Sequence, residues 1–382
     1  LEQFGNASSI HHYGQHARAA VEKARAAVAA LLNARPAEIV FTSGGTEGDN
    51  ASIFGLVQRG DHVITSTIEH SAVLNTCKRL EQMGCEVTCV PVNGQSQIDP
   101  GDIRKALRPN TRLISVMMAN NETGVIQPVE EIGRIAQEAD VFFHTDAVQA
   151  AGKIPIDVQK IGCDVLSISG HKIHAPQGTG AMFVKKGTLI QPLIYGGSHE
   201  RQRRAGTENL PGIVGLGKAA EMAKHWLLCS STSESGVNGA LESGGPAEMA
   251  AMRDRLQDEV LGRVEAAGVN GQGAERVPNT TNLWFDFIEG EALVIALDLK
   301  GLAVSSGAAC SSGAIEPSHV LLAMGLAHER ARASVRISLG KQTTADDVDF
   351  AIQVIPETVA RLREISPLYK KAPLATSSAG RN

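Results

Sequence analysis

A lysine follows a short apolar segment that has the composition of a buried strand. The segment is residues 165–169, and Lys172 comes three residues after its end. A lysine that is partly shielded from water can lose its proton and form an imine with an aldehyde. The alternative is an ordinary exposed lysine or a phosphate ligand, because most lysines in proteins are exposed. The interpretation of Lys172 as an imine-forming lysine therefore depends on the other polar residues of the sequence.

Two of these companions suit a phosphorylated pyridine aldehyde. Asp146 follows the strand-like residues 141–145, where a carboxylate could pair with a pyridinium nitrogen, and the alternative is a helix N-cap. Gln149 could reach the phenolic oxygen of the same ring. Gly44-Gly45-Thr46 lies where a strand turns into a helix, and the N–H groups there favour an anion, although such glycines can serve the backbone alone. Together with Lys172, these residues predict a pyridoxal phosphate site.

Three further polar residues could complete the site. His70 follows a strand and could stack on the cofactor ring and shuttle protons, although a single histidine is usually structural. Asn121 lies in Asn-Asn-Glu-Thr-Gly, which is either a simple turn or a binder of cofactor or substrate carboxylate. Arg336 has apolar neighbours, and a partly buried arginine needs an anionic partner. That partner is either a substrate carboxylate or a structural ion pair.

A cysteine among small residues offers a second nucleophile. Cys310 lies in Gly-Ala-Ala-Cys-Ser-Ser-Gly, a composition that suits an exposed loop, and exposure favours a reactive thiolate. A structural or incidental cysteine is the alternative. The chain has 6 cysteines and no C-x-x-C pair, so a zinc or iron–sulfur cage held by this chain alone is not expected.

Alternating strands and helices position these residues. Strand-like segments alternate with helical ones up to about residue 185, which predicts an α/β fold with a mostly parallel sheet covered on both faces. Ligands bind at the carboxyl ends of the strands in such sheets, and Thr46, Asn121, Asp146 and Lys172 all follow strands. The expected strands are residues 38–42, 62–66, 86–92, 112–118, 141–145, 165–169 and 180–185, with helices at 15–32, 71–83, 101–107 and 128–139.

A change of pattern after residue 206 predicts a second, smaller α+β domain. We expect a large domain over 1–209 and a smaller C-terminal domain over 210–371, with a disordered tail over 372–382. Residues 229–246 are rich in Ser and Gly and predict a flexible insertion. Within the smaller domain the expected helices are 211–227, 247–265, 290–299 and 344–363, and the expected strands are 282–287 and 334–339.

Composition narrows the functional classes. The chain has 382 residues with 20% charged residues and a net charge of −5, so no affinity for nucleic acid is predicted. It contains no run of about 18 apolar residues and no signal peptide at its beginning, so we expect no membrane contact and a cytoplasmic location.

The motifs together resemble the NifS/IscS-type cysteine desulfurases, which have the pyridoxal phosphate fold-type-I architecture of the class-V aminotransferases. The resemblance spans nearly the whole chain in the order of the family. The family begins with a segment containing an Asp-x-Ala-Thr-Thr-like motif, and the sequence here starts after it. The matching segments are FGNASS (4–9), EIVFTSGGTE (38–47), IEHSAVL (68–74), NNETGV (120–125), HTDAVQ (144–149), SGHKIHAPQGTGA (169–181), HERQRRAGTEN (199–209), SSGAACSSGAIEPSHVL (305–321) and VRISLG (335–340).

The resemblance implies a role for each matching residue. Lys172 would carry the cofactor, and His70 would stack on its ring. The resemblance further implies that Asp146 and Gln149 hold the ring nitrogen and phenolic oxygen. The phosphate ligands would be Gly45, Thr46, Ser169 and His171, with Thr207 supplied by the other subunit of a homodimer. Asn121 and Arg336 would hold the substrate carboxylate.

The activity that the resemblance implies is removal of sulfur from L-cysteine. Cys310 would accept the sulfur as a persulfide and pass it to an iron–sulfur scaffold or another acceptor protein, with L-alanine as the other product. Cys310 could also be shared with a scaffold-bound iron–sulfur cluster. The alternatives are an aminotransferase or a selenocysteine lyase on the same fold, neither of which requires Cys310, and a weakly active scaffold in iron–sulfur assembly.

Overall fold

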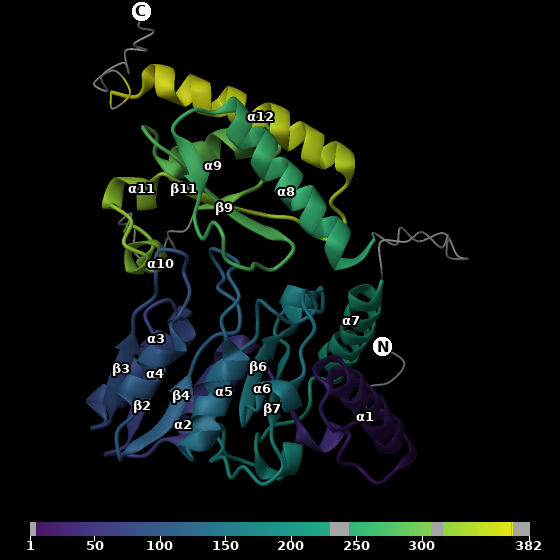
Figure 1. Cartoon of the computed structure of the whole chain (residues 1–382). Coiled ribbons are helices and arrows are strands. Elements are labelled where there is room, and N and C mark those ends of the chain that lie inside the picture. The colour runs from purple at the N-terminus through teal and green to yellow at the C-terminus, as the bar shows by residue number, and fades with distance from the viewer. Residues whose placement is uncertain (1–4, 230–243, 307–315, 368, 370–382) are drawn as a thin grey trace, which may run out of the picture.

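A seven-stranded sheet forms the centre of the larger part of the molecule (Figure 1). The computed structural model describes residues 5–229, 244–306, 316–367 and 369. Cys310, most of the expected 229–246 insertion and the 372–382 tail lie outside the described residues. The strand order is β1-β7-β6-β5-β4-β2-β3, and the pairs from β6 to β3 are all parallel. The strands are β1 (Ile39–Thr42), β2 (His62–Ser66), β3 (Glu86–Val90), β4 (Thr111–Ser115), β5 (Phe142–Asp146), β6 (Val165–Ser169) and β7 (Gly180–Val184).

Helices bury both faces of this sheet, as the near-continuous apolar strands require. Successive strand residues point to opposite faces, so Ile39 and Phe41 join one core while Val40 joins the other. The first core is covered by α1, α5 and α7, and the second by α2 and α3. The helices in this part are α1 (His12–Leu32), α2 (Gly45–Leu56), α3 (Ser71–Gln82), α4 (Pro100–Ala106), α5 (Val129–Glu138), α6 (Val158–Ile161) and α7 (Leu210–Leu228).

A four-stranded antiparallel sheet forms the smaller part, above the first sheet in Figure 1. Its order is β10-β11-β9-β8, and its core contains residues of α8, α9 and α12. The α/β architecture with a mostly parallel sheet and a smaller α+β part is therefore confirmed. Its elements are α8 (Gly245–Arg263), β8 (Ala267–Val269), β9 (Thr280–Phe285), α9 (Gly290–Asp298), β10 (Ser305–Ser306), α10 (His319–Ala323), α11 (His328–Arg332), β11 (Ser334–Ser338) and α12 (Ala345–Ile365).

Helix α7 links the two parts. The sequence placed it in the smaller domain, whereas Ile213, Leu216 and Ala220 pack in the same core as α1. Only Trp226, near its end, belongs to the core of the smaller part. The buried residues therefore favour a domain boundary after α7.

Several elements were not expected from the sequence. They are short: α6, β8, β10, α10 and α11 have 2 to 5 residues each. The expected elements begin and end within three residues of the observed ones. Strand β7 runs antiparallel to both β1 and β6. None of the described helices is both long and apolar enough to span a membrane.

Candidate active site

A cavity of about 430 Å³ lies at the carboxyl ends of the central strands. It brings together residues from segments up to about 290 positions apart, because parallel strands end at one edge of a sheet and Arg336 approaches from β11. The lining includes all the predicted site residues of the described chain except Thr207: Gly45, Thr46, His70, Asn121, Asp146, Gln149, Ser169, His171, Lys172 and Arg336.

Lys172 enters this cavity from a single 3-10 turn, Gly170–Ile173, directly after β6. Burial and the nearby Arg336 guanidinium lower the pKa of Lys172 below that of an ordinary lysine, while Asp146 opposes the shift. Such an amine is neutral in a larger fraction of molecules, as a nucleophile and proton acceptor must be.

Asp146 is the last residue of β5, and β5 pairs with β6, the strand that precedes Lys172. One carboxylate oxygen accepts a hydrogen bond from the Val148 N–H at 2.8 Å. Burial, followed by the nearby Asp49 carboxyl, raises the pKa of Asp146 to about 8. A cation next to Asp146 would stabilise its carboxylate form, and a pyridinium N–H is such a cation.

The lining of the cavity around the start of α2 is suited to an anion. Helix α2 starts at Gly45, and its first N–H groups have no partners within the helix. A Cβ at Gly45 would lie 2.6 Å from Val148 Cγ2, so close packing requires glycine here. Ser169 Oγ and His171 Nδ1 are 2.8 Å apart and line the same cavity together with the exposed Thr46. These donors fit a phosphate group.

Asn121 and Arg336 have polar atoms that lack partners. The buried Asn121 Oδ1 and Arg336 Nε have no hydrogen-bond partner in the described part of the chain. Arg336 Nη1 donates to the Asn121 carbonyl oxygen at 2.7 Å, which holds the two residues together across the two domains. Buried polar atoms without partners are costly, so this corner fits a polar ligand such as a carboxylate.

His70 caps helix α3, and its Nδ1 accepts a hydrogen bond from the Ala72 N–H at 3.1 Å. The pKa of His70 is lowered by burial and then by the positive charges of Lys172 and His319. The ring is therefore predominantly neutral at pH 7, with its proton on Nε2 because Nδ1 accepts.

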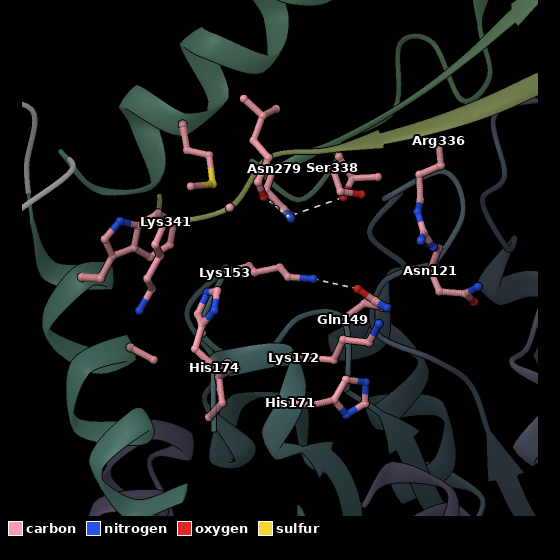
Figure 2. Close-up of a pocket in the computed structure, with 18 residues that line it drawn as sticks. Asn121, Gln149, Lys153, His171, Lys172, His174, Asn279, Arg336, Ser338 and Lys341 are labelled. Carbon is pink, nitrogen blue, oxygen red and sulfur yellow. Dashed lines mark hydrogen bonds between the residues drawn. The ribbon is translucent and has the colours of Figure 1, made fainter. Parts of the chain in front are cut away.

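Sequence reasoning missed a lysine behind Gln149. Lys153 Nζ donates to Gln149 Oε1 at 2.7 Å, which leaves the amide N–H₂ of Gln149 available to the cavity (Figure 2). Gln149 and Lys153 are four residues apart, a spacing that brings side chains together on a helix. The segment shows no helical periodicity, so this spacing gave little reason to predict the contact.

It also missed a buried acid in the wall of the cavity, Asp49. Asp49 lies four residues after Gly45 on α2, and its Oδ1 is 3.5 Å from His144 Nε2. Burial raises the pKa of Asp49 to about 7. Asp49 lines the same cavity as Asp146, and its carboxyl contributes to the raised pKa of Asp146.

Thr207 is exposed and does not line this cavity within its own chain. It follows the segment His199–Gln202, in which Glu200 accepts hydrogen bonds from Arg25 Nη1 and Nη2 at 2.7 and 2.8 Å. Its predicted role in the other subunit stays a prediction.

Comparison with known proteins agrees with this architecture. The profile of the Aminotransferase class-V family matches residues 1–350, so the chain belongs to that family. A "Cysteine desulfurase IscS" of Methanosarcina thermophila is 47% identical over 374 residues, which cover 97% of this chain and 89% of the relative. A "Cysteine desulfurase" of Nostoc sp. is 48% identical over 369 residues, with coverages of 96% and 88%. Within the family, the chain therefore groups with the cysteine desulfurases.

Solved structures show the same fold. A "NIFS-LIKE PROTEIN" superimposes with a TM-score of 0.84 at 36% identity and covers 94% of this chain and 93% of that one. A structure described as "SspA in complex with cysteine" has a TM-score of 0.75 at 35% identity, with coverages of 90% and 93%.

Proposed function

We propose that the chain is a pyridoxal phosphate-dependent cysteine desulfurase that converts L-cysteine to L-alanine and carries the sulfur on Cys310. The observation that carries this proposal is the convergence of Lys172, Asp146 and the start of α2 on one cavity. The unpaired atoms of Asn121 and Arg336 lie in the same cavity, so a place for an amino-acid carboxylate adjoins the place for the cofactor.

The residues present fit the cofactor. Gly45, Thr46, Ser169 and His171 would hold its phosphate, with Thr207 of the other subunit. His70 would stack on the ring, Asp146 would accept the pyridinium N–H, and the Gln149 amide would donate to the phenolic oxygen. Each of these groups except Thr207 lines the cavity.

When bound, pyridoxal phosphate supplies an aldehyde that takes up the amine of the substrate and a protonated ring that stabilises negative charge at Cα. Lys172 would remove the Cα proton, since its lowered pKa leaves a larger fraction of the amine unprotonated. The Arg336 guanidinium would hold the substrate carboxylate, which orients the Cα–H bond toward Lys172.

Sulfur transfer needs a thiolate, and the described cysteines do not suit that role. Burial raises the pKa of Cys77, Cys85 and Cys163 above that of an ordinary thiol, to about 12 for Cys77. None of the five described cysteines lines the cavity. Ser306 pairs with Val335, the residue before Arg336. Cys310 follows Ser306 by four residues, and four residues span at most about 14 Å.

The transfer step forms one bond and breaks one. The Cys310 thiolate would form an S–S bond with the substrate sulfur while the Cβ–S bond of the substrate breaks. The electron pair of the broken Cβ–S bond stays with Cβ. Protonation of that carbon then leads to L-alanine, and Cys310 keeps the sulfur as a persulfide. The sulfur would pass to an iron–sulfur scaffold or another acceptor protein. Cys310 could also serve as a ligand to a scaffold-bound cluster.

The working form would be a homodimer in the cytoplasm. Leu189 and Tyr195 are 88% and 78% exposed, and these large apolar side chains lie in the segment between β7 and Thr207. An apolar segment of this kind suits a subunit interface. The five described cysteines are free thiols, which suits a reducing compartment.

The proposal is tested by product analysis. The cofactor-loaded protein is incubated with L-cysteine and a reductant, and L-alanine and sulfide are quantified. We expect the two products in equal amounts. Formation of a keto acid with an aminated cofactor would instead indicate an aminotransferase, and alanine released only from selenocysteine would indicate a selenocysteine lyase.

Replacing Asp146 should separate cofactor binding from catalysis. We expect Asp146→Asn to bind cofactor but to lose about 10²–10³-fold in turnover, because a neutral amide stabilises the pyridinium poorly. Turnover is measured as alanine released per bound cofactor. Asp164→Asn is the control, since Asp164 precedes β6 at the opposite edge of the sheet and accepts from the Phe143 N–H. Equal turnover in both variants would mean that Asp146 acts only as a cap.

A further inference from the structure

Helix α10 belongs to the smaller part of the molecule but packs on the larger part, at the boundary between the two (Figure 1). Its Val320 and Leu321 share a buried apolar cluster with Ile68 and Met117. Ile68 lies two residues before His70, in the loop that leads into α3. The helix is therefore docked beside a segment that supplies a residue of the candidate active site.

Two hydrogen bonds orient this contact. Ser318 Oγ, at the N-cap of α10, donates to Glu122 Oε2 at 2.5 Å, and Glu122 directly follows Asn121. His319 Nε2 lies 3.0 Å from the Glu69 carbonyl oxygen, to which it donates. Apolar packing is non-directional, whereas hydrogen bonds depend on distance and angle. These two bonds therefore fix how the start of α10 is placed against the active-site loops.

The loops that accept these bonds are held in place themselves. Asn120 joins them, because its Nδ2 donates to the Ile68 carbonyl oxygen at 3.0 Å and its Oδ1 accepts from the Glu122 N–H at 2.9 Å. Asn282 Nδ2, on β9, donates to the Glu122 carbonyl oxygen at 3.1 Å. Glu122 is 6% exposed, so its carboxyl group would be costly to leave without a partner. The Ser318 hydroxyl therefore meets a fixed acceptor.

The same contact attaches one end of the chain that contains Cys310. Cys310 comes four residues after Ser306 and eight residues before Ser318. Strand β10 ends at Ser306 and pairs with β11 around Arg336, whereas Ser318 is bound to the residue after Asn121. Both attachment points therefore adjoin the residues proposed to hold the substrate carboxylate. Fixing both ends of a connecting chain restricts where its residues can lie, which raises the effective concentration of a reacting group at its target.

We propose that Ser318 and Glu122 are positioning residues for sulfur transfer, because their hydrogen bond fixes the chain that carries Cys310 relative to the bound substrate. Neither residue lines the candidate active-site cavity, so neither would touch the substrate or the cofactor. The inference rests on the proposed function and adds two residues to it. Its consequence is specific: loss of the bond slows sulfur transfer and leaves the uptake of L-cysteine by the cofactor unchanged.

The test measures the two steps separately in the cofactor-loaded enzyme. Rapid mixing with L-cysteine gives the concentration dependence of the cofactor absorption change, and alanine release gives the rate of transfer. We expect Ser318→Ala and Glu122→Met each to lower alanine release about tenfold, with the half-saturating L-cysteine concentration of the absorption change unaltered. The double variant should also lose about tenfold, because both substitutions break one bond. Ser318→Thr keeps the hydroxyl and should retain alanine release.

Thr344→Ala is the matched control for the loss of a helix cap. Thr344 Oγ1 caps α12 and accepts from the Asp347 N–H at 3.2 Å, the distance at which Ser318 Oγ accepts from the Leu321 N–H. We expect this variant to release alanine normally. Far-ultraviolet circular dichroism and cofactor absorption verify that each variant is folded.

Three outcomes would overturn the inference while leaving the proposed function intact. They are normal alanine release by Ser318→Ala, a loss of about a hundredfold in the double variant, and an equal loss in Thr344→Ala. A rise in the half-saturating L-cysteine concentration that accounts for the slower release would assign Glu122 to substrate binding and would overturn it too. Absence of alanine from the unsubstituted enzyme would refute the proposed function and this inference together.

Discussion

Lys172→Ala is expected to abolish both the absorption band of lysine-bound cofactor and the turnover of L-cysteine. The substitution removes the amine that would attach the cofactor and the base that would move the Cα proton. Loss of proton transfer alone costs about 10²–10⁴-fold in rate. The absorption spectrum and alanine release of the cofactor-reconstituted variant measure the two effects.

Lys185→Ala is the matched control. Lys185 also follows a strand, but β7 runs antiparallel to β6, so Lys185 lies at the opposite edge of the sheet, 3.5 Å from Asp164. We expect normal spectra and turnover from this variant. Borohydride reduction followed by peptide mass spectrometry locates the attached cofactor, and its attachment to another lysine in Lys172→Ala would contradict the assignment.

Cys310→Ser is expected to retain the cofactor and its spectral response to L-cysteine while it loses sulfur transfer. A serine hydroxyl is a poor nucleophile toward sulfur, whereas cofactor attachment depends on Lys172. We expect no persulfide and a decrease in alanine release on the order of 10²-fold or more. Mass spectrometry after brief exposure to L-cysteine should find the added sulfur on Cys310 in the unsubstituted protein.

Cys89→Ser provides the comparison, because Cys89 is exposed and free but does not line the candidate active site. It should transfer sulfur normally. Normal alanine release by Cys310→Ser, or sulfur found on Cys77 or Cys229, would contradict the mechanism and favour the lyase or aminotransferase alternatives.

Most of the architecture could be predicted from local patterns. The strands β2 and β6 were predicted with their observed ends because each five-residue segment contains β-branched apolar residues and directly follows an aspartate in a Gly- and Asp-containing turn segment. The short elements β8 and β10 were not predicted, since two or three residues carry no periodicity. The antiparallel direction of β7 was not predicted either, because direction depends on the path of the connecting turn.

The assignment of α7 shows the same limit. Its sequence is apolar around much of its surface, and this pattern identifies a buried helix without indicating which core buries it. Only the packing against α1 decides that.

The sequence by itself determined the residue types, their order and the strand ends that they follow, which sufficed to predict Lys172, Asp146 and the start of α2 as parts of one site. Local chain geometry carries this information, because carboxyl ends of parallel strands meet at one edge. The tertiary structure decided how far β11 brings Arg336 toward Asn121, and it decided the contact of Lys153 with Gln149. Arg336 and Asn121 come from different elements, and the burial and nearby charges that set the pKa values of Lys172 and Asp146 exist only once the elements have packed.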